Sequence, residues 1–469
     1  MKRIFIAIAI TLLSAGCAVG PDYGRPALKV PANFRAPEPL PPSQGDSLAN
    51  LKWFEVFKDE QLQALIRTGL ERNFDLRLAV ARVEQSHAQL GIVRSNQFPQ
   101  FGAQGTVEIN RLSRDGATAL PPQILPSQNR NFGTATLGLL SYEIDIWGKL
   151  RRATEAARAT LLNAEESRKA VVTTLVADLA TAYLTLRELD YSLEISERTL
   201  TSREHSLELT QSRQTGGVST LLDLRQAQQL VETAAETIPG IQQQIELTEN
   251  QIHLLLGDGP GEVARGRDFL SQELPPEVPS GLPSELLERR PDIRAAEQNL
   301  VAANAQIGVA KAEYFPTFSL SGALGGQSTQ LAALFAGPHT IWNLAPQVTQ
   351  PIFTAGRIKS DVKLAQAERE GAQIEYEKTV QTAFAEVSNG LIAHQRVRES
   401  RERQEALVAA LRDRLRLAYV RYRGGVDTQL NALDADRDSF QAELDLARIR
   451  LDESLTVVQL YKALGGGWQ

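Results

Sequence analysis

The chain has 469 residues, a net charge of −6 and no basic run, and this balance argues against a nucleic-acid-binding protein. The five histidines are scattered, and no two of them lie three to five positions apart, so the sequence lacks a helical zinc pair. Cys17 is the only cysteine, which excludes a disulfide framework. By length alone, the chain corresponds to about three average domains.

Residues 1–16 are predicted to be a secretory signal peptide. A basic start precedes an apolar run at 4–13 that is too short to cross a bilayer. The residues before Cys17 resemble a bacterial lipobox, in which signal cleavage leaves an acylated cysteine, so we expect Cys17 to carry lipid. An ordinary signal peptide with an incidental cysteine is the alternative. Ala18 is not the aspartate that retains such proteins in the inner membrane, and this favours the outer membrane.

A proline-rich tether is expected at 17–50. Seven prolines lie between positions 21 and 42, and such a stretch cannot pack as a helix or a sheet. The acylated cysteine would therefore be joined to the folded body by an extended segment.

The rest of the chain is duplicated, with a first repeat at 51–273 and a second at 274–469. Residues 73–101 align without gaps to residues 290–318, with nine identical positions. Further matches share an offset of 208 residues: Gly148 with Gly356, Gly216-Gly217-Val218 with Gly424-Gly425-Val426, and Gly257 with Gly465. Each repeat is expected to contain a helix, two strands and a long helical hairpin.

Alternation of polar and apolar residues predicts two strands in each repeat, at about 101–146 and about 318–352. The alternation slips near Leu140, which predicts a bulge or an early end there. Four strands cannot close a barrel and would leave bare edges, so the pattern favours several chains that pool their strands. A small soluble sheet packed on the helices is the alternative.

Two long antiparallel helical hairpins are predicted, at 149–256 and 357–464. The 65 residues from Lys149 to Arg213 contain no proline or glycine, which corresponds to a helix of roughly 98 Å. Apolar positions step by three and four along both arms, as in a coiled-coil seam. The seam continues through Pro239, so a kink is expected there rather than a helix end.

The two arms of each hairpin differ in predicted length: 149–215 pairs with 218–256, and 357–423 with 426–464. Helices at about 60–97 and 284–314 are expected to continue the shorter arms end to end. The glycine pairs would then form the far tips, roughly 100 Å from the strands.

Four segments together resemble the TolC-like family of outer-membrane efflux factors, in its lipoprotein (NodT-type) branch. They are GPDYGRP at 20–26, SYEIDIWGKLRRA at 141–153, RRPDIRAAEQNLVAANAQIGVAKAEYFPTFSLSG at 289–322 and LYKALGGGW at 460–468. The resemblance implies a mainly α fold with a β-barrel part, assembled from three chains. Long antiparallel α-helical hairpins would form a trimeric tunnel, and four strands per chain would contribute to a shared transmembrane twelve-stranded β-barrel.

The resemblance also implies adaptor-docking turns at Arg213–Asp223 and Arg421–Asp434. The tips of these turns are expected to dock a periplasmic adaptor, and their residues are Arg213, Gly216, Gly217, Val218, Ser219, Gly424, Gly425, Val426 and Asp427. Asp427 replaces a latch arginine of some family members, so the latch network must differ here.

The tunnel-entrance gate is expected to consist of Tyr422, Asp223, Asp434 and Asn431. Tyr422 would bond across to Asp223 and hold neighbouring hairpins shut. Asp434 matches one position of a ring of aspartates that narrows the entrance, whereas Asn431 occupies a ring position that is aspartate in some members. The ring would then attract cations less strongly. On spacing alone, a solvated helix face is the favoured interpretation of Asp434, since Asp436 and Asp438 follow closely.

These expectations describe a passive duct: the outer-membrane component of a tripartite efflux system that exports small solutes such as drugs and toxic compounds. The implied partners are two further copies of the chain, a periplasmic adaptor (membrane fusion) protein, an inner-membrane pump of the resistance-nodulation-division type, and outer-membrane lipid. No cofactor, metal or nucleic acid is expected. The duct would be anchored in the outer membrane of a Gram-negative cell, with its helices in the periplasm.

Two other functions, a structural scaffold and an enzyme, fit the sequence less well than the duct does. A lipid-anchored coiled-coil scaffold that spans the periplasm without a pore would not need the amphipathic strand that begins at Phe101. An enzyme is disfavoured because the sequence has no Gly-x-Ser-x-Gly elbow and no histidine-based metal cluster, and because the glycines at 322–326 are not followed by the lysine of a phosphate loop.

Overall fold

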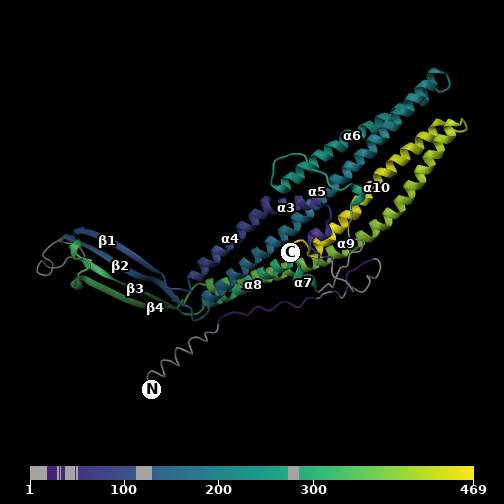
Figure 1. The fold of residues 1–469 in the computed structure, drawn as a ribbon. Helices are drawn as coiled ribbons and strands as arrows, with labels where there is room; N and C mark the ends of the chain where they lie inside the picture. Colours follow the sequence, from purple (N-terminus) through teal and green to yellow (C-terminus); the bar gives the residue numbers. More distant parts are fainter. Residues whose placement is uncertain are drawn as a thin grey trace. The chain divides into compact units, whose positions relative to one another are not determined.

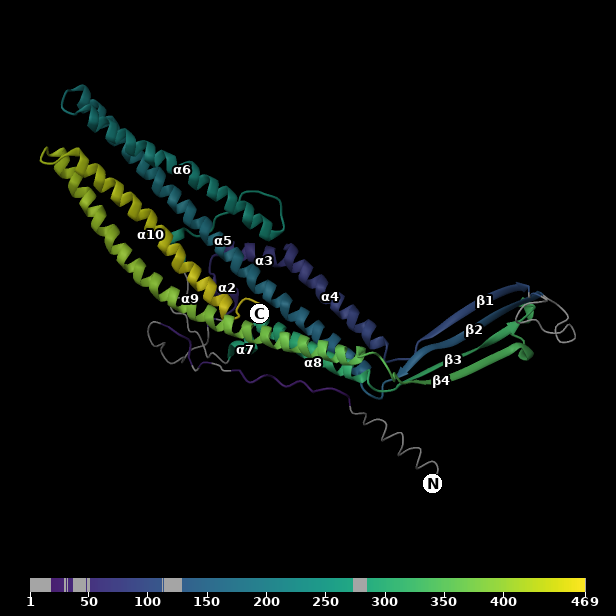
Figure 2. The same ribbon diagram turned by 180° about the vertical axis from the view of Figure 1, so that it is seen from behind.

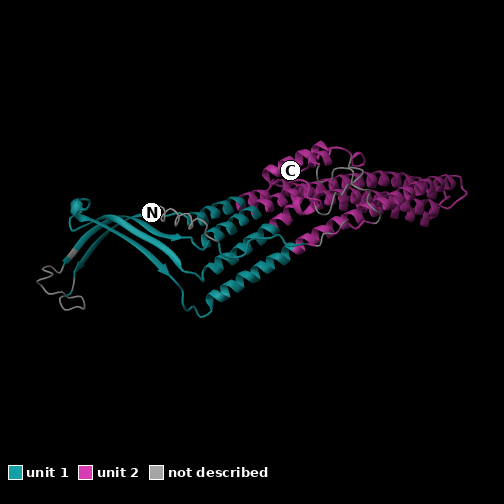
Figure 3. Cartoon of the chain, turned by 90° about the horizontal axis from the view of Figure 1, so that it is seen from below, with its two compact units in different colours: residues 1–27, 83–163, 296–376 teal, residues 28–82, 164–295, 377–469 magenta. Residues whose placement is uncertain are grey.

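The computed structural model describes residues 18–28, 31, 33–36, 48, 51–111, 113, 129–272 and 285–468. The predicted signal peptide, Cys17 and most of the predicted tether lie outside these residues. The chain divides into two compact units, and each unit takes segments from both repeats (Figure 3). Unit 1 comprises residues 1–27, 83–163 and 296–376, and unit 2 comprises residues 28–82, 164–295 and 377–469.

Unit 1 contains a four-stranded antiparallel sheet in the order β1-β2-β3-β4 (Figure 1). The strands are β1 (Phe101–Arg111), β2 (Asn129–Ile144), β3 (Thr317–Ser328) and β4 (Thr340–Thr349). The four predicted strands are therefore confirmed, with shorter bounds than expected. The register between β2 and β3 shifts between Leu139 and Tyr142, which confirms the bulge predicted near Leu140. In the described residues, β1 and β4 are the two edges of the sheet.

The strand register gives the sheet one apolar and one polar face. Directly paired residues share a face, and Leu324 pairs with both Leu137 and Trp342. The large side chains of this face are 59 to 77% exposed: Phe101, Val107, Ile109, Leu137, Leu324, Trp342, Leu344 and Val348. The other face is mostly polar and includes Gln104, Thr106, Glu108, Thr134, Thr136, Ser319, Gln327, Asn343 and Gln347. A continuous exposed apolar surface of this kind marks contact with a membrane or another protein.

The residues after position 17 are held by contacts with the rest of unit 1, one of them beside the sheet. The backbone N–H of Val19 donates to the carbonyl of Trp147, three residues beyond β2, at 2.9 Å. The indole of Trp147 stacks on Phe315 with ring centroids 4.6 Å apart. Arg25 donates to both carboxylate oxygens of Glu297, at 2.7 Å each. The segment that leads away from the N-terminus is thus held at several points.

The longest helices form two antiparallel pairs, α5 with α6 and α9 with α10 (Figures 1 and 2). Their bounds are α2 (Trp53–Val56), α3 (Glu60–Arg72), α4 (Phe74–Ser95), α5 (Lys149–Thr215), α6 (Leu221–Leu256), α7 (Leu286–Arg289), α8 (Pro291–Ala312), α9 (Arg357–Arg423) and α10 (Gln429–Ala463). Short 3₁₀ turns occur at η2 (Phe269–Ser271), η4 (Leu331–Ala333) and η5 (Gly337–His339). The helix α6 runs through Pro239 without ending, as predicted.

The predicted hairpins α5–α6 and α9–α10 are confirmed, but their return helices start later than expected. The helix α6 begins at Leu221 rather than at 218, and α10 begins at Gln429 rather than at 426. The reason is that Thr220 and Thr428 adopt extended backbone conformations and cap the return helices with their side chains.

The prediction of single helices at 60–97 and 284–314 was wrong, because each is interrupted once. Asn73 separates α3 from α4: its side-chain oxygen accepts from the N–H of Leu76 at 2.9 Å, and its amide donates to the carbonyl of Leu255 at 2.8 Å. Arg290 separates α7 from α8, because a residue before a proline avoids the helical conformation, and Pro291 follows it.

Within the described residues, α5 contains one 18-residue stretch apolar enough to cross a membrane, and 56% of that stretch is buried inside the structure. Val176, Ala180 and Tyr183 on this helix have no exposed surface. This part of α5 therefore contributes to the core of unit 2.

Candidate functional site at the hairpin tips

Both hairpins of unit 2 reverse direction at their glycine pairs, and the first does so through a Schellman motif. Val218 donates its N–H to the carbonyl of Arg213 at 2.9 Å, and Gly217 donates to Gln214 at 3.0 Å. Gly217 has φ +73°, a left-handed conformation that side chains with a Cβ rarely adopt. The glycine is needed at the second position of the pair.

The second tip repeats this geometry. Val426 donates to the carbonyl of Arg421 and Gly425 donates to that of Tyr422, both at 3.1 Å, and Gly425 has φ +74°. The duplicated glycines thus give the same helix end in both repeats.

The side chain of Asp223 is engaged in the first turn. One carboxylate oxygen accepts from the N–H and the hydroxyl of Thr220, both at 2.8 Å, while the N–H of Asp223 donates back to that hydroxyl. This capping box starts α6. The hydrogen bond from the Thr220 N–H is the main cause that lowers the pKa of Asp223 below 3.8. The carboxylate of Asp223 therefore stays ionised and stabilises its own turn.

Asp427 has the corresponding role in the second turn, through a different network. It accepts from the amide of Asn431 at 2.6 Å, from the guanidinium of Arg421 at 3.0 Å and from the N–H of Thr428 at 2.9 Å. These bonds, that from Asn431 foremost, lower the pKa of Asp427. Two residues that depart from the expected gate pattern, Asp427 and Asn431, thus form one network that closes the turn.

The hydroxyl of Tyr422 is linked to the other hairpin through Gln429, and its ring contacts that hairpin directly. Its hydroxyl donates to the side-chain oxygen of Gln429 at 3.2 Å. Gln429 donates in turn to the hydroxyl of Thr210 at 3.0 Å and to the backbone carbonyl of Asp223 at 3.4 Å. The guanidinium of Arg213 lies over the Tyr422 ring, 4.9 Å from its centroid. Within one chain, the tyrosine and Asp223 are therefore neighbours that share Gln429.

Asp434 lies on the first part of α10 beside a positive charge. Its carboxylate lies 3.3 Å from the guanidinium of Arg437, which also bonds Asp438 at 2.9 Å. The side chain of Asp434 is 39% exposed. The negative charge expected at this position is partly neutralised by its own helix.

Sequence reasoning missed Gln429, Thr210 and Arg437. Arg437 was detectable, since it lies three positions after Asp434 on one helix face. Gln429 and Thr210 carry no such signal, because their contact depends on how the two hairpins are aligned.

The tips also present apolar side chains. Val218 is 73% exposed and Val426 is 67% exposed, and Leu221 and Leu222 beside them are 58% and 66% exposed. The turns thus have hydrogen-bonded backbones and apolar surfaces, a combination suited to docking another protein.

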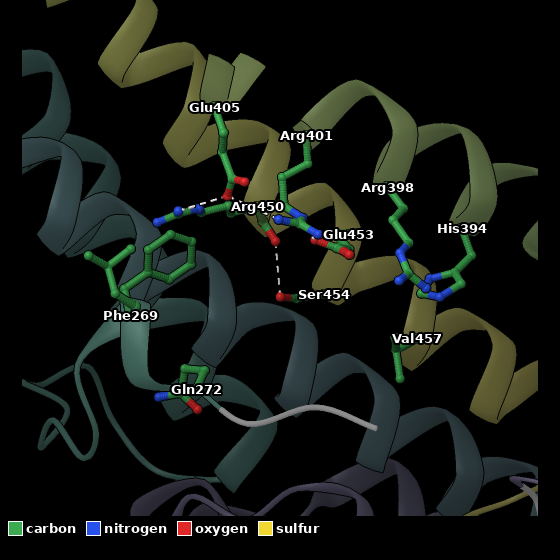
Figure 4. Close-up of a pocket in the computed structure, with 11 residues that line it drawn as sticks. Phe269, Gln272, His394, Arg398, Arg401, Glu405, Arg450, Glu453, Ser454 and Val457 are labelled. Carbon is green, nitrogen blue, oxygen red and sulfur yellow. Dashed lines mark hydrogen bonds and ion pairs between the residues drawn. The ribbon is translucent and has the colours of Figure 1, made fainter. Parts of the chain in front are cut away.

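A cavity of about 370 Å³ lies beside η2, α9 and α10 in unit 2 (Figure 4). Four of its charged side chains form two ion pairs: Arg401 lies 2.6 Å from Glu453, and Arg450 lies 2.9 Å from Glu405. Burial lowers the pKa of His394 at the cavity wall. This arrangement is that of a packing network. Over the described ranges, no cluster of three or more histidine, cysteine, aspartate or glutamate side chains could hold a metal ion.

The sequence matches the family model described as "Outer membrane efflux protein" over residues 65–258 and 282–466, one match within each predicted repeat. The toluene efflux pump outer membrane protein TtgC of Pseudomonas putida is 38% identical over 476 residues, which cover 100% of this chain and 96% of that protein. The outer membrane protein OprJ of Pseudomonas aeruginosa is 35% identical, over 98% of this chain and 95% of that protein. The crystal structure of the open state of the MtrE outer membrane channel of Neisseria gonorrhoeae superposes with a TM-score of 0.87, at 31% identity, and covers 97% of this chain and 99% of that chain.

Proposed function

Because this chain belongs to the outer membrane efflux protein family, we propose that it forms the passive outer-membrane duct of a tripartite efflux system. Three copies assemble into one conduit. The duct does no chemistry, and the energy for export comes from the pump with which it works. One observation carries the proposal: a sheet with an exposed apolar face and two free edges is joined to long helical hairpins.

The sheet supports a shared barrel. Four strands are too few to close, and the free edges β1 and β4 of neighbouring copies can pair to give twelve strands. The exposed apolar face then contacts lipid, and the polar face lines the conduit. Trp342 is 75% exposed, and an exposed tryptophan would not stabilise a soluble scaffold.

The anchor is the acylated Cys17. Its attachment is supported by the residues that follow, since the N–H of Val19 donates to the carbonyl of Trp147, three residues beyond β2. A lipid on Cys17 would reach the membrane beside the strands that cross it.

The tips supply the docking surface and the gate. A periplasmic adaptor docks on the two glycine turns, where Val218 and Val426 are exposed, and an inner-membrane pump of the resistance-nodulation-division type completes the system. Tyr422 and Asp223 hold neighbouring hairpins closed, and Asp434 narrows the entrance. The Arg437 beside Asp434 makes this entrance less attractive to cations.

The cargo consists of small organic compounds. The named cargo of TtgC, toluene, supports this class. The polar face of the sheet would let such solutes pass without binding them tightly.

Planar-bilayer recording of the purified full-length protein tests the duct. We expect discrete current steps, which become larger in a variant with Tyr422→Phe and Asp434→Ala. A folded, membrane-inserted protein that carries no current, in either form, would favour the coiled-coil scaffold. In cells that lack the chain, restored toluene tolerance on re-expression would support the cargo class.

A further inference from the structure

The buried side chains of α5 change from apolar to polar towards the tip. From Leu175 to Ile195 most of them are apolar. Beyond Ile195, the buried residues of α5 are Ser196, Arg203 and Thr210, which are spaced seven positions apart. A spacing of seven keeps one stripe of a helix facing the same partner.

The partner of this stripe is α10 of the other hairpin. Gln429, Asp436 and Glu443 on α10 are also spaced by seven. Thr210 bonds Gln429 at 3.0 Å and Arg203 bonds Asp436 at 2.6 Å. Farther from the tip, Glu443 bonds Arg198 of α5 at 2.6 Å. We call these three polar pairs the inter-hairpin ladder.

Arg203–Asp436 is the central and most buried ion pair of the ladder. The side chains of Arg203 and Asp436 are 3% and 9% exposed. Arg203 also donates to the carbonyl of Leu230 on α6 at 2.9 Å, and its guanidinium lies 4.9 Å from the ring centroid of Phe440. Burial raises the pKa of Asp436, and Arg203 opposes this rise. One arginine thus connects both arms of its own hairpin to the other hairpin.

A polar seam behaves differently from an apolar one when two helices part. Separation of an apolar seam exposes hydrophobic surface to water, whereas the groups of a polar seam exchange their partners for water. The two charges of a buried ion pair regain their hydration when the helices separate. Removal of only one partner, in contrast, strongly destabilises the packed state, because the remaining charge is buried without compensation. Polar pairs of this kind therefore hold one register firmly and still permit separation.

We propose that the Arg203–Asp436 pair is the principal catch that holds the two hairpins of each chain closed, and that the Tyr422 contacts at the tip are secondary. The inference rests on the proposed duct. It places the catch ten residues before Arg213 along α5, about 15 Å behind the tip.

Charge-removal variants test the catch by planar-bilayer recording of the full-length protein. We expect Asp436→Asn and Arg203→Met each to raise the single-channel conductance at least threefold, and more than Tyr422→Phe does. The swap of Arg203→Asp with Asp436→Arg is expected to return the conductance towards the wild-type level. Wild-type conductance in both single variants, alongside a raised conductance in Tyr422→Phe, would overturn the proposal.

The matched control is a pair that lies within one hairpin. Arg401 and Glu453 are 2.6 Å apart and join α9 to α10, so Arg401→Met and Glu453→Gln remove the same charges without touching the ladder. These variants are expected to conduct like the wild type. An equal rise in the control variants would mean that any lost ion pair loosens the helices, and would reject a specific catch.

Hydrogen exchange separates failure of the catch from failure of the duct. In Asp436→Asn, backbone amides at 198–213 and 429–443 are expected to exchange at least tenfold faster, with no change in Glu453→Gln. This readout needs no current. Faster exchange in a protein that never conducts would retain the catch and reject the duct, whereas unchanged exchange would reject the catch.

Discussion

At the scale of single residues, Arg437 sets the charge that Asp434 presents at the entrance. The arginine lies between Asp434 and Asp438, and its own side chain is 59% exposed. Its removal leaves the carboxylate of Asp434 without this cation, while Asp438 keeps its bond to Arg414 at 2.8 Å, so we expect Arg437→Gln to make the channel more selective for cations. The reversal potential in a potassium chloride gradient measures this change.

Arg416→Gln is the control for that substitution. Arg416 is similarly exposed, and its ion pair is with Asp413 on its own helix α9. Equal shifts in the two variants would show that the reversal potential reports total charge, and that Asp434 does not line the entrance.

Residue contacts were the least predictable feature of this chain. The resemblance suggested that Tyr422 bonds Asp223, and in the single chain Gln429 bonds the tyrosine instead. The carboxylate of Asp223 is already used by Thr220, a capping arrangement that the spacing from 220 to 223 does predict. Contacts within one turn follow from sequence spacing. Contacts between the two hairpins depend on how the hairpins are positioned against each other, which no local sequence pattern encodes.

At the scale of elements, the tips depend on one glycine of each pair. An added Cβ at Gly217 would be strained by φ +73°, whereas at Gly216 it would meet only ordinary contacts, at 3.5 Å from the carbonyl oxygen of Ser212. Gly217→Ala is therefore expected to destabilise the turn by about 1 kcal/mol. Faster hydrogen exchange of the Val218 N–H would report the loss.

Gly216→Ala provides the comparison, because Gly216 directly follows the last residue of α5 and alanine has a higher helix propensity than glycine. It should leave exchange at Val218 unchanged or slower. Faster exchange in Gly216→Ala than in Gly217→Ala would show that crowding, and not backbone conformation, limits the turn.

Most elements were predictable because long periodic stretches define them. The strand that starts at Phe101 and the 67-residue helix α5 follow directly from residue spacing. The breaks at Asn73 and Arg290 were missed. Pro291 signals the second break locally, but the first depends on a bond from Asn73 to Leu255, which is distant in the sequence.

At the scale of the whole molecule, the two faces of the sheet meet different surroundings in the proposed barrel. Leu344 lies in the middle of β4 on the apolar face and is 62% exposed. An arginine on the lipid-facing surface of a barrel costs about 2–4 kcal/mol near the bilayer midplane. We therefore expect Leu344→Arg to abolish the detergent-resistant trimer in outer-membrane fractions.

Asn343→Arg tests the opposite face at the neighbouring position. Asn343 pairs with Ala323 on the polar face, so an arginine there would point into the water-filled conduit. We expect a normal yield of trimer. Loss of trimer in both variants would contradict the assignment of faces, and normal trimer in both would contradict a lipid-facing sheet.

The equal lengths of α5 and α9, 67 residues each, have a consequence for how such a chain can evolve. Loss of seven residues from α5 alone would draw Gly217 back by about 10.5 Å relative to Gly425, and would misalign every pair of the ladder. A change in the reach of the hairpins is tolerable only when both copies of the ancient duplication change together. After the duplication, the length of α5 therefore constrains the length of α9, and the length of α9 constrains that of α5.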